Sequence, residues 1–79
     1  MRLIHIRAGT DRDVECLLRE LAVYSPKHLG RRTILIELRH GSNNDISTLL
    51  SAIEACVSQN DIRSVRLELD GETYTLAAQ

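Results

Sequence analysis

Two alternating runs separated by Asp70-Gly71 constrain this chain more than any other feature of its sequence. An Asp-Gly pair between runs of alternating apolar and polar residues is the strongest short-range signal for a β-hairpin with a two-residue turn. Such a turn sets the register of three pairs that share one face: Leu69–Glu72, Leu67–Tyr74 and Val65–Leu76. The hairpin therefore predicts a sheet with one apolar face and one face toward water.

The first third of the chain predicts a strand followed by a helix. Residues Arg2–Ala8 alternate in the manner of a strand, and a glycine follows. Thr10 is a good N-cap for a helix whose apolar positions recur at helical spacing as far as Tyr24. Pro26 disfavours helical geometry in the residue before it, so the helix is expected to end there and Lys27–Gly30 to form a connection.

The middle of the chain predicts a second strand and a second helix. Arg32–Arg39 is rich in β-branched and aliphatic residues, and every second residue is apolar, so that Ile34, Ile36 and Leu38 share one face. An apolar stripe at helical spacing then runs from Ile46 to Val57. Asn60 is a reasonable helix stop because asparagine tolerates left-handed backbone geometry.

The resulting order is β-α-β-α-β-β in a single domain of residues 1–79. Right-handed crossovers would place both helices on one face of a four-stranded mixed sheet, which gives a two-layer α/β sandwich of the α+β type. We expect the strand order 1-2-4-3, because this order leaves the more polar hairpin strand Val65–Leu69 at an edge.

At fold level this layout resembles the C-terminal domain of the third bacterial initiation factor, the Alba nucleic-acid binders and the TusA-like sulfur carriers. The likeness to the carriers covers the last half of the chain. Those carriers open their first helix with a Cys-Pro pair, where this chain has Thr10-Asp11. The resemblance therefore implies a fold, and it does not extend to the residues that carry sulfur transfer.

Composition limits the classes of function. The chain has 79 residues, a net charge of −1 and neither Phe nor Trp, so the core must be small and aliphatic and self-association is expected to bury more surface. No apolar run reaches the roughly 20 residues of a membrane span, and no signal-peptide pattern begins the chain. We therefore expect a cytoplasmic protein that does not associate with membranes.

Cysteine and histidine spacing indicates no metal site and no cofactor. Cys16 and Cys56 are expected on helices of parallel direction, offset by roughly 8 Å along their axes, and hence as reduced thiols.

One candidate anion-binding site lies where two parallel strands would end at the same sheet edge. Backbone amides at a helix start, together with an arginine and a hydroxyl, suit a phosphate or carboxylate. The residues predicted for this site are Arg7, Gly9, Thr10, Arg39, His40, Ser42 and Asn43. Ordinary helix capping by Thr10 and Ser42 explains the same residues, and His40 as a general base lacks a matched nucleophile.

A second candidate is a basic cluster that would contact the phosphates of a nucleic acid. It comprises Lys27, His28, Arg31 and Arg32, expected at the opposite edge of the sheet. Cations after a helix C-terminus also favour the helix dipole, and no aromatic residue that would stack on bases accompanies them.

Two apolar pairs are candidate interface residues. Leu3 and Leu35 are the large apolar side chains expected on the helix-free face of the sheet. Cys16 and Val23 are expected on the outer face of the first helix, among charged residues.

These observations favour a non-catalytic protein-interaction or regulatory domain that binds itself or another protein, as a homodimer. The alternative is a module that binds nucleic acid or a phosphate ligand through the loop edge or the Lys27–Arg32 cluster. An enzyme centred on His40 is the third hypothesis. It ranks below the other two because no catalytic constellation accompanies that histidine.

Overall fold

The C-terminal hairpin forms in the register that the sequence predicts. In a computed structural model that describes residues 2–38 and 44–77, β4 (Ser64–Leu69) pairs antiparallel with β5 (Glu72–Ala77). Its turn residues Asp70 and Gly71 have φ of 53° and 82°, the left-handed geometry that a two-residue hairpin turn requires. The pairs Leu67–Tyr74 and Val65–Leu76 face the helices, as expected.

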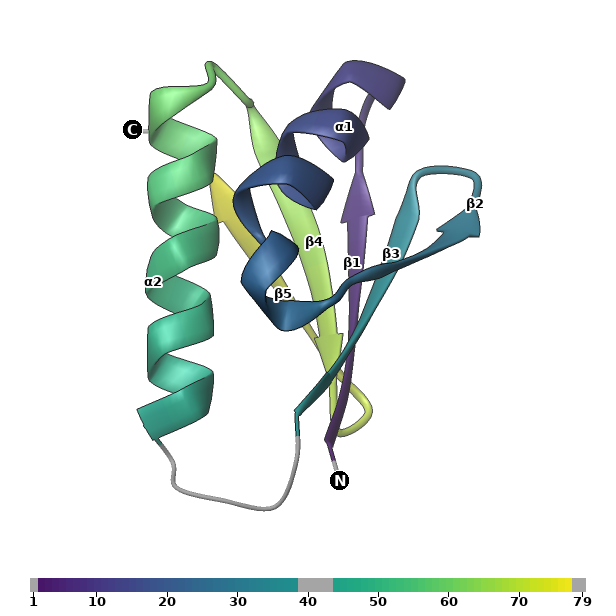
Figure 1. The fold of residues 1–79 in the computed structure, drawn as a ribbon, viewed down its shortest axis with the longest axis vertical. Coiled ribbons are helices and arrows are strands. Elements are labelled where there is room, and N and C mark those ends of the chain that lie inside the picture. The colour runs from purple at the N-terminus through teal and green to yellow at the C-terminus, as the bar shows by residue number, and fades with distance from the viewer. Residues whose placement is uncertain (1, 39–43, 78–79) are drawn as a thin grey trace.

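The remaining described elements are two helices, three strands and a short helical turn (Figure 1). In chain order they are β1 (Arg2–Ala8), α1 (Asp11–Glu20), the 3-10 turn η1 (Ala22–Tyr24), β2 (Lys27–Gly30), β3 (Thr33–Leu38) and α2 (Asn44–Gln59). Thr10 caps α1 as predicted, since its hydroxyl accepts a hydrogen bond from the Asp13 backbone N–H at 3.1 Å.

The sheet differs from the expected one in strand number, direction and order. Within the described residues it has five strands in the order β2-β3-β1-β4-β5, and every neighbouring pair is antiparallel. The predicted four-stranded mixed sheet with order 1-2-4-3 is therefore wrong. So is the expected edge position of Val65–Leu69, because β4 lies beside β1 and β5 takes the edge.

The additional strand β2 explains why β3 runs antiparallel to β1, and not parallel to it as predicted. Residues Lys27–Gly30 were predicted as a connection, but they form a strand that pairs antiparallel with β3. The chain reverses direction at Arg31 and Arg32, and β3 therefore runs antiparallel to β1. Both turn residues have positive φ, 43° and 64°. Two arginines give no hairpin signal, because Asn and Gly are the residues that favour this geometry.

The order of elements produces two interlocked split β-α-β units. β3 lies between β1 and β2, and β1 lies between β3 and β4. This is the ferredoxin-like pattern, with β5 added at one edge. It departs from the β-α-β-α-β-β layout on which the fold-level resemblance depended.

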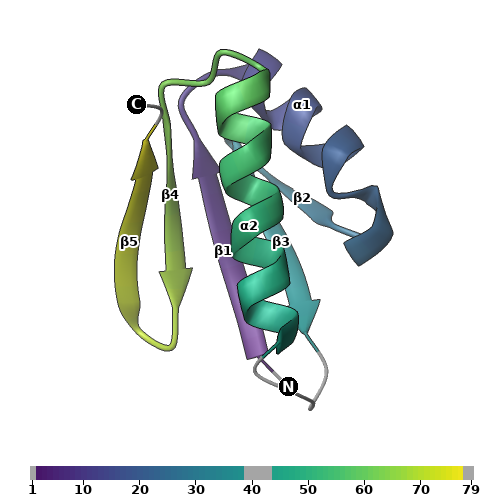
Figure 2. The same cartoon turned by 90° about the vertical axis from the view of Figure 1, so that its left-hand side faces the viewer.

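Both helices cover one face of the sheet, which confirms the two-layer arrangement (Figure 2). The core between the layers is aliphatic, as predicted from the lack of Phe and Trp. Its fully buried side chains are Ile4, Ile6, Leu17, Leu21, Ile34, Ile36, Leu49, Ile53, Val57, Ile62, Val65 and Leu67. Tyr74, which the hairpin register places on the apolar face, is 46% exposed near the β5 edge.

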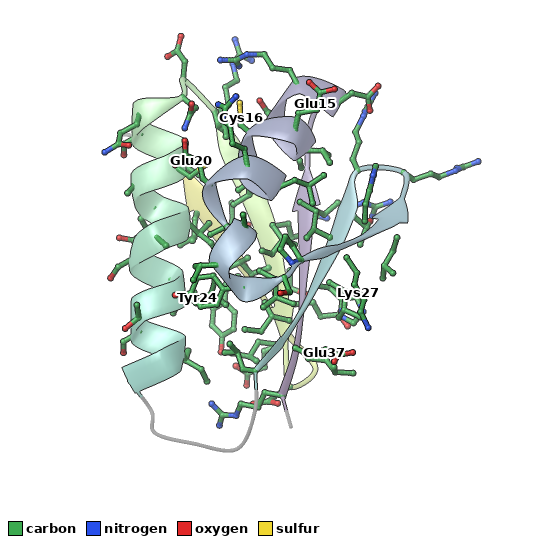
Figure 3. The ribbon with its side chains drawn as sticks, in the orientation of Figure 1. Glu15, Cys16, Glu20, Tyr24, Lys27 and Glu37 are labelled. Atoms are coloured by element: carbon green, nitrogen blue, oxygen red, sulfur yellow. The ribbon has the colours of Figure 1, made fainter. Side chains whose placement is uncertain are left out.

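The two helices run antiparallel to each other, not parallel as predicted. The Arg12 guanidinium at the start of α1 donates a 2.6 Å hydrogen bond to the Asn60 carbonyl just past the end of α2. Cys16, expected on the outer face, is buried and 7% exposed, because α1 packs against α2 as well as the sheet (Figure 3). The axial offset predicted between Cys16 and Cys56 is therefore wrong, although both thiols are free.

Candidate anion-binding site

The helix-free face of the sheet carries two arginines that lie directly opposite each other. Arg7 of β1 pairs in register with Arg66 of β4, and both side chains are exposed. Two like charges at directly opposed positions destabilise a sheet. Among the residues that the structure describes, neither arginine forms an ion pair or a side-chain hydrogen bond.

Hydroxyl groups extend the same row on both sides of the arginine pair. Thr33 of β3 lies opposite Arg7, and Thr75 of β5 lies opposite Arg66. The row therefore reads Thr33, Arg7, Arg66 and Thr75 across four neighbouring strands. Guanidinium N–H groups and threonine hydroxyls are all donors, which is the set that binds the oxygens of an anion.

The surface is hollowed at this row. A depression of about 360 Å³ is lined by residues of four strands, namely His5, Arg7, Thr33, Arg66, Glu68 and Thr73. A second depression of about 300 Å³ lies on the other side of the arginine pair, with Arg7, Ala8, Gly9, Ser64, Val65, Arg66 and Thr75 in its wall. Arg7 and Arg66 line both hollows.

One carboxylate sets the limit of the site. Glu68 lies opposite His5, two residues along the strands from the arginine pair. Its negative charge opposes an anion at that end of the larger hollow. The favourable position for an anion is therefore the Arg7–Arg66 end, toward Gly9 and Ser64.

The antiparallel sheet places the ends of β1 and β3 apart, although the sequence predicted them together. Gly9 and Thr10 follow the end of β1, whereas β3 ends at Leu38, which pairs with Arg2 at the start of β1. The expectation that both strands end at one edge is therefore wrong. Arg39, His40, Ser42 and Asn43 lie outside the described residues, so their part in a site stays a prediction.

Two residues of the predicted basic cluster, Arg32 and Lys27, form contacts with other parts of the chain. Arg32 donates to the Gly9 carbonyl at 3.1 Å and pairs with Asp11 at 3.3 Å, so it ties the β2–β3 turn to the start of α1. This places the turn at the same end of the sheet as Gly9, not at the opposite edge as expected. Lys27 pairs with Glu37 at 3.4 Å (Figure 3).

The other two members of that cluster are exposed. His28 lies on β2 opposite Ile34, and Arg31 lies in the adjacent turn. The cluster is therefore not one continuous basic surface.

The predicted interface residues also occupy separate places. Leu3 is 46% exposed and Leu35 half-buried, and their register makes them diagonal neighbours on the open face. Val23 is 84% exposed in η1. Its expected companion Cys16 lies at the contact between α1 and α2, so those two residues form no common surface.

Sequence reasoning did not include Arg66 in a candidate site. The alternation of β4 places this residue on the open face, but nothing in the chain indicates which strand lies beside β1. The pairing with Arg7 follows only from the tertiary structure.

Comparison of the chain with protein-family models, with curated proteins and with solved structures finds no match. No group of His, Cys, Asp or Glu side chains in the described part of the chain could hold a metal ion. Neither of its helices, as far as they are described, is both long and apolar enough for a membrane span.

Proposed function

We propose that this chain is a binding domain that holds a phosphate group on the open face of its sheet, between Arg7 and Arg66. The observation that carries the proposal is the direct opposition in register of Arg7 and Arg66, two exposed arginines that have no carboxylate partner among the described residues. A bound anion would convert this repulsion into two charge-assisted contacts.

The same chemistry serves a free phosphate compound and the backbone of a nucleic acid. The sheet face has no exposed aromatic residue in the Arg7–Arg66 hollow on which bases would stack, and His5 is the one ring in its lining. Recognition would therefore depend on phosphate and not on base sequence.

Titration calorimetry at low ionic strength tests the proposal with two probes, inorganic phosphate and a short single-stranded oligonucleotide. Arg7→Gln and Arg66→Gln are each expected to weaken binding by about tenfold, the loss of one charged contact. Arg19→Gln is the matched control, because it removes the same charge from the helix layer, where Arg19 pairs with Glu20.

Binding of both probes with a steep decrease in affinity at higher salt would support a nucleic-acid backbone ligand. Binding of phosphate alone would indicate a small phosphate compound. The proposal is wrong if neither probe binds at low salt, or if the control loses as much affinity as the two site variants.

A homodimeric interaction domain is kept as the second candidate function, although the contact residues that the sequence predicts for it, Leu3, Leu35, Cys16 and Val23, do not form one surface. Its structural support is the β5 edge of the sheet, where the backbone groups on the outer side lack a described partner strand.

A further inference from the structure

The two edges of the sheet differ in how they are protected from other strands. Edge strands expose unpaired backbone N–H and C=O groups, and proteins block them with short strands, lysines, prolines and bulges. β2 shows three of these devices, because it has four residues, begins with Lys27 and shifts register between His28 and Gly30, and Pro26 directly precedes it.

The β5 edge shows none of these devices. β5 has six residues, pairs with β4 without any register shift, and contains neither proline nor lysine. Glu72 is its one charged residue, and the five residues from Thr73 to Ala77 are uncharged. An unprotected strand of this length and composition favours the addition of another strand.

We propose that a second copy of this chain pairs with β5 through its own β5, antiparallel across a two-fold axis. Self-pairing suits this strand because its charge lies at one end. In an antiparallel arrangement the two Glu72 residues then lie at opposite ends of the contact, where they do not repel each other. The helices of both copies would cover the same face of one continuous sheet, since the axis is perpendicular to the sheet.

The backbone of β5 also determines the register. Hydrogen-bonded and non-hydrogen-bonded pairs alternate along an antiparallel ladder, beginning with the bonded pair Leu69–Glu72 at the two-residue turn. The backbone groups of Thr73, Thr75 and Ala77 therefore point away from β4. A two-fold axis at Thr75 uses all three, because it places each Thr75 opposite the other and each Thr73 opposite an Ala77.

Side chains on the helix side fit the same register. Tyr74, 46% exposed, would lie opposite Leu76 of the second copy. Beside Leu76 is a hollow of about 520 Å³ between α2 and β5, lined by Glu54, Val57, Ser58, Thr75, Leu76 and Ala77. The tyrosine ring, whose hydroxyl group donates a 2.6 Å hydrogen bond to the Glu72 carboxylate of its own strand, would cover the apolar part of that hollow.

This dimer has a consequence for the open face. The row of Thr33, Arg7, Arg66 and Thr75 would continue across the axis into the same row of the second copy. With strands about 4.8 Å apart, the two Arg66 positions would be roughly 14 Å apart. Binding of a polyanion by this longer row depends on the proposed phosphate site. The proposed dimer does not depend on that site.

Sedimentation equilibrium, over protein concentrations from micromolar to millimolar and without phosphate, tests the dimer. Thr75→Pro removes an N–H that points away from β4, so the hairpin is expected to remain while dimerisation weakens by at least about tenfold. Tyr74→Lys is the second variant, because it places a charge opposite Leu76. Val23→Lys is its matched control, with the same charge added at an exposed site on η1.

Wild-type dimerisation that Thr75→Pro and Tyr74→Lys weaken, and that Val23→Lys leaves unchanged, supports the proposal. If Thr75→Pro alters the circular dichroism spectrum, Tyr74→Lys and its control decide the outcome. A wild-type protein that stays monomeric throughout overturns the proposal, as does a dimer that only Val23→Lys dissociates. Neither result bears on phosphate binding, which is measured separately.

Discussion

The hydroxyl group of Thr10 accepts a hydrogen bond from the backbone N–H of Asp13 at 3.1 Å. This contact satisfies one of the free N–H groups at the start of α1, directly after β1. Thr10→Ala should therefore lower the free energy of unfolding by about 1 kcal/mol, measured by urea denaturation. Thr10→Ser retains the oxygen and should lose much less. Equal losses in both variants would show that the cap is not the cause.

The opposed pair Arg7 and Arg66 predicts an increase in stability on charge reversal. Arg66→Glu replaces repulsion with attraction and should raise the free energy of unfolding by about 0.2–1 kcal/mol at low salt. Arg66→Gln only removes repulsion, so its gain should be smaller. Thermal denaturation at low and high salt checks both. A variant with glutamate that is less stable than the one with glutamine would contradict the assignment of unrelieved repulsion.

The turn between β2 and β3 predicts a second stabilising substitution. Arg31 has a φ of 43°, a left-handed conformation that costs most residues about 1 kcal/mol or more and that asparagine tolerates better. Arg31→Asn should recover part of that cost in urea denaturation. Arg32→Asn is the comparison, because it loses the contacts of Arg32 with Gly9 and Asp11 and should give no gain. The prediction fails if both variants behave alike.

The buried thiol of Cys56 is expected to make the free energy of unfolding depend on pH. Burial raises the pKa of its thiol above the ordinary value, and the nearby Glu20 carboxylate acts in the same direction. Above the unfolded-state pKa of about 8.5, the unfolded chain releases this proton first, so the folded state binds more protons and stability decreases with rising pH. The free energy of unfolding should begin to decrease at about pH 8.5, near the unfolded-state pKa, and should stop decreasing near the folded-state pKa.

Comparison with Cys56→Ala isolates this contribution from other groups that titrate in alkali. The variant is less stable at all pH values because it lacks the buried sulfur, but its free energy of unfolding should decrease less steeply above the thiol pKa. Parallel curves for the two proteins would rule out the thiol as the source. Denaturation followed by circular dichroism at a series of pH values provides the measurement.

Features that depend on residues close together in the chain were predicted from the sequence. The Asp70-Gly71 turn set the β4–β5 register, and the hydroxyl of Thr10 identified the start of α1. The alternation of β1 and β4 likewise puts Arg7 and Arg66 on the face opposite the buried side chains. Turn geometry, capping and side-chain alternation are local properties, so the residues that decide them are at most a few positions apart.

Features that depend on which segments meet were decided by the tertiary structure. β2 gave no signal because two arginines occupy its turn, and without β2 the direction of β3 was inferred incorrectly. That direction determines which loops share an end of the sheet. Cys16 is buried because α1 packs against α2 as well as the sheet. Arg7 faces Arg66 because β4 pairs with β1, a choice made by long-range packing and not by either strand alone.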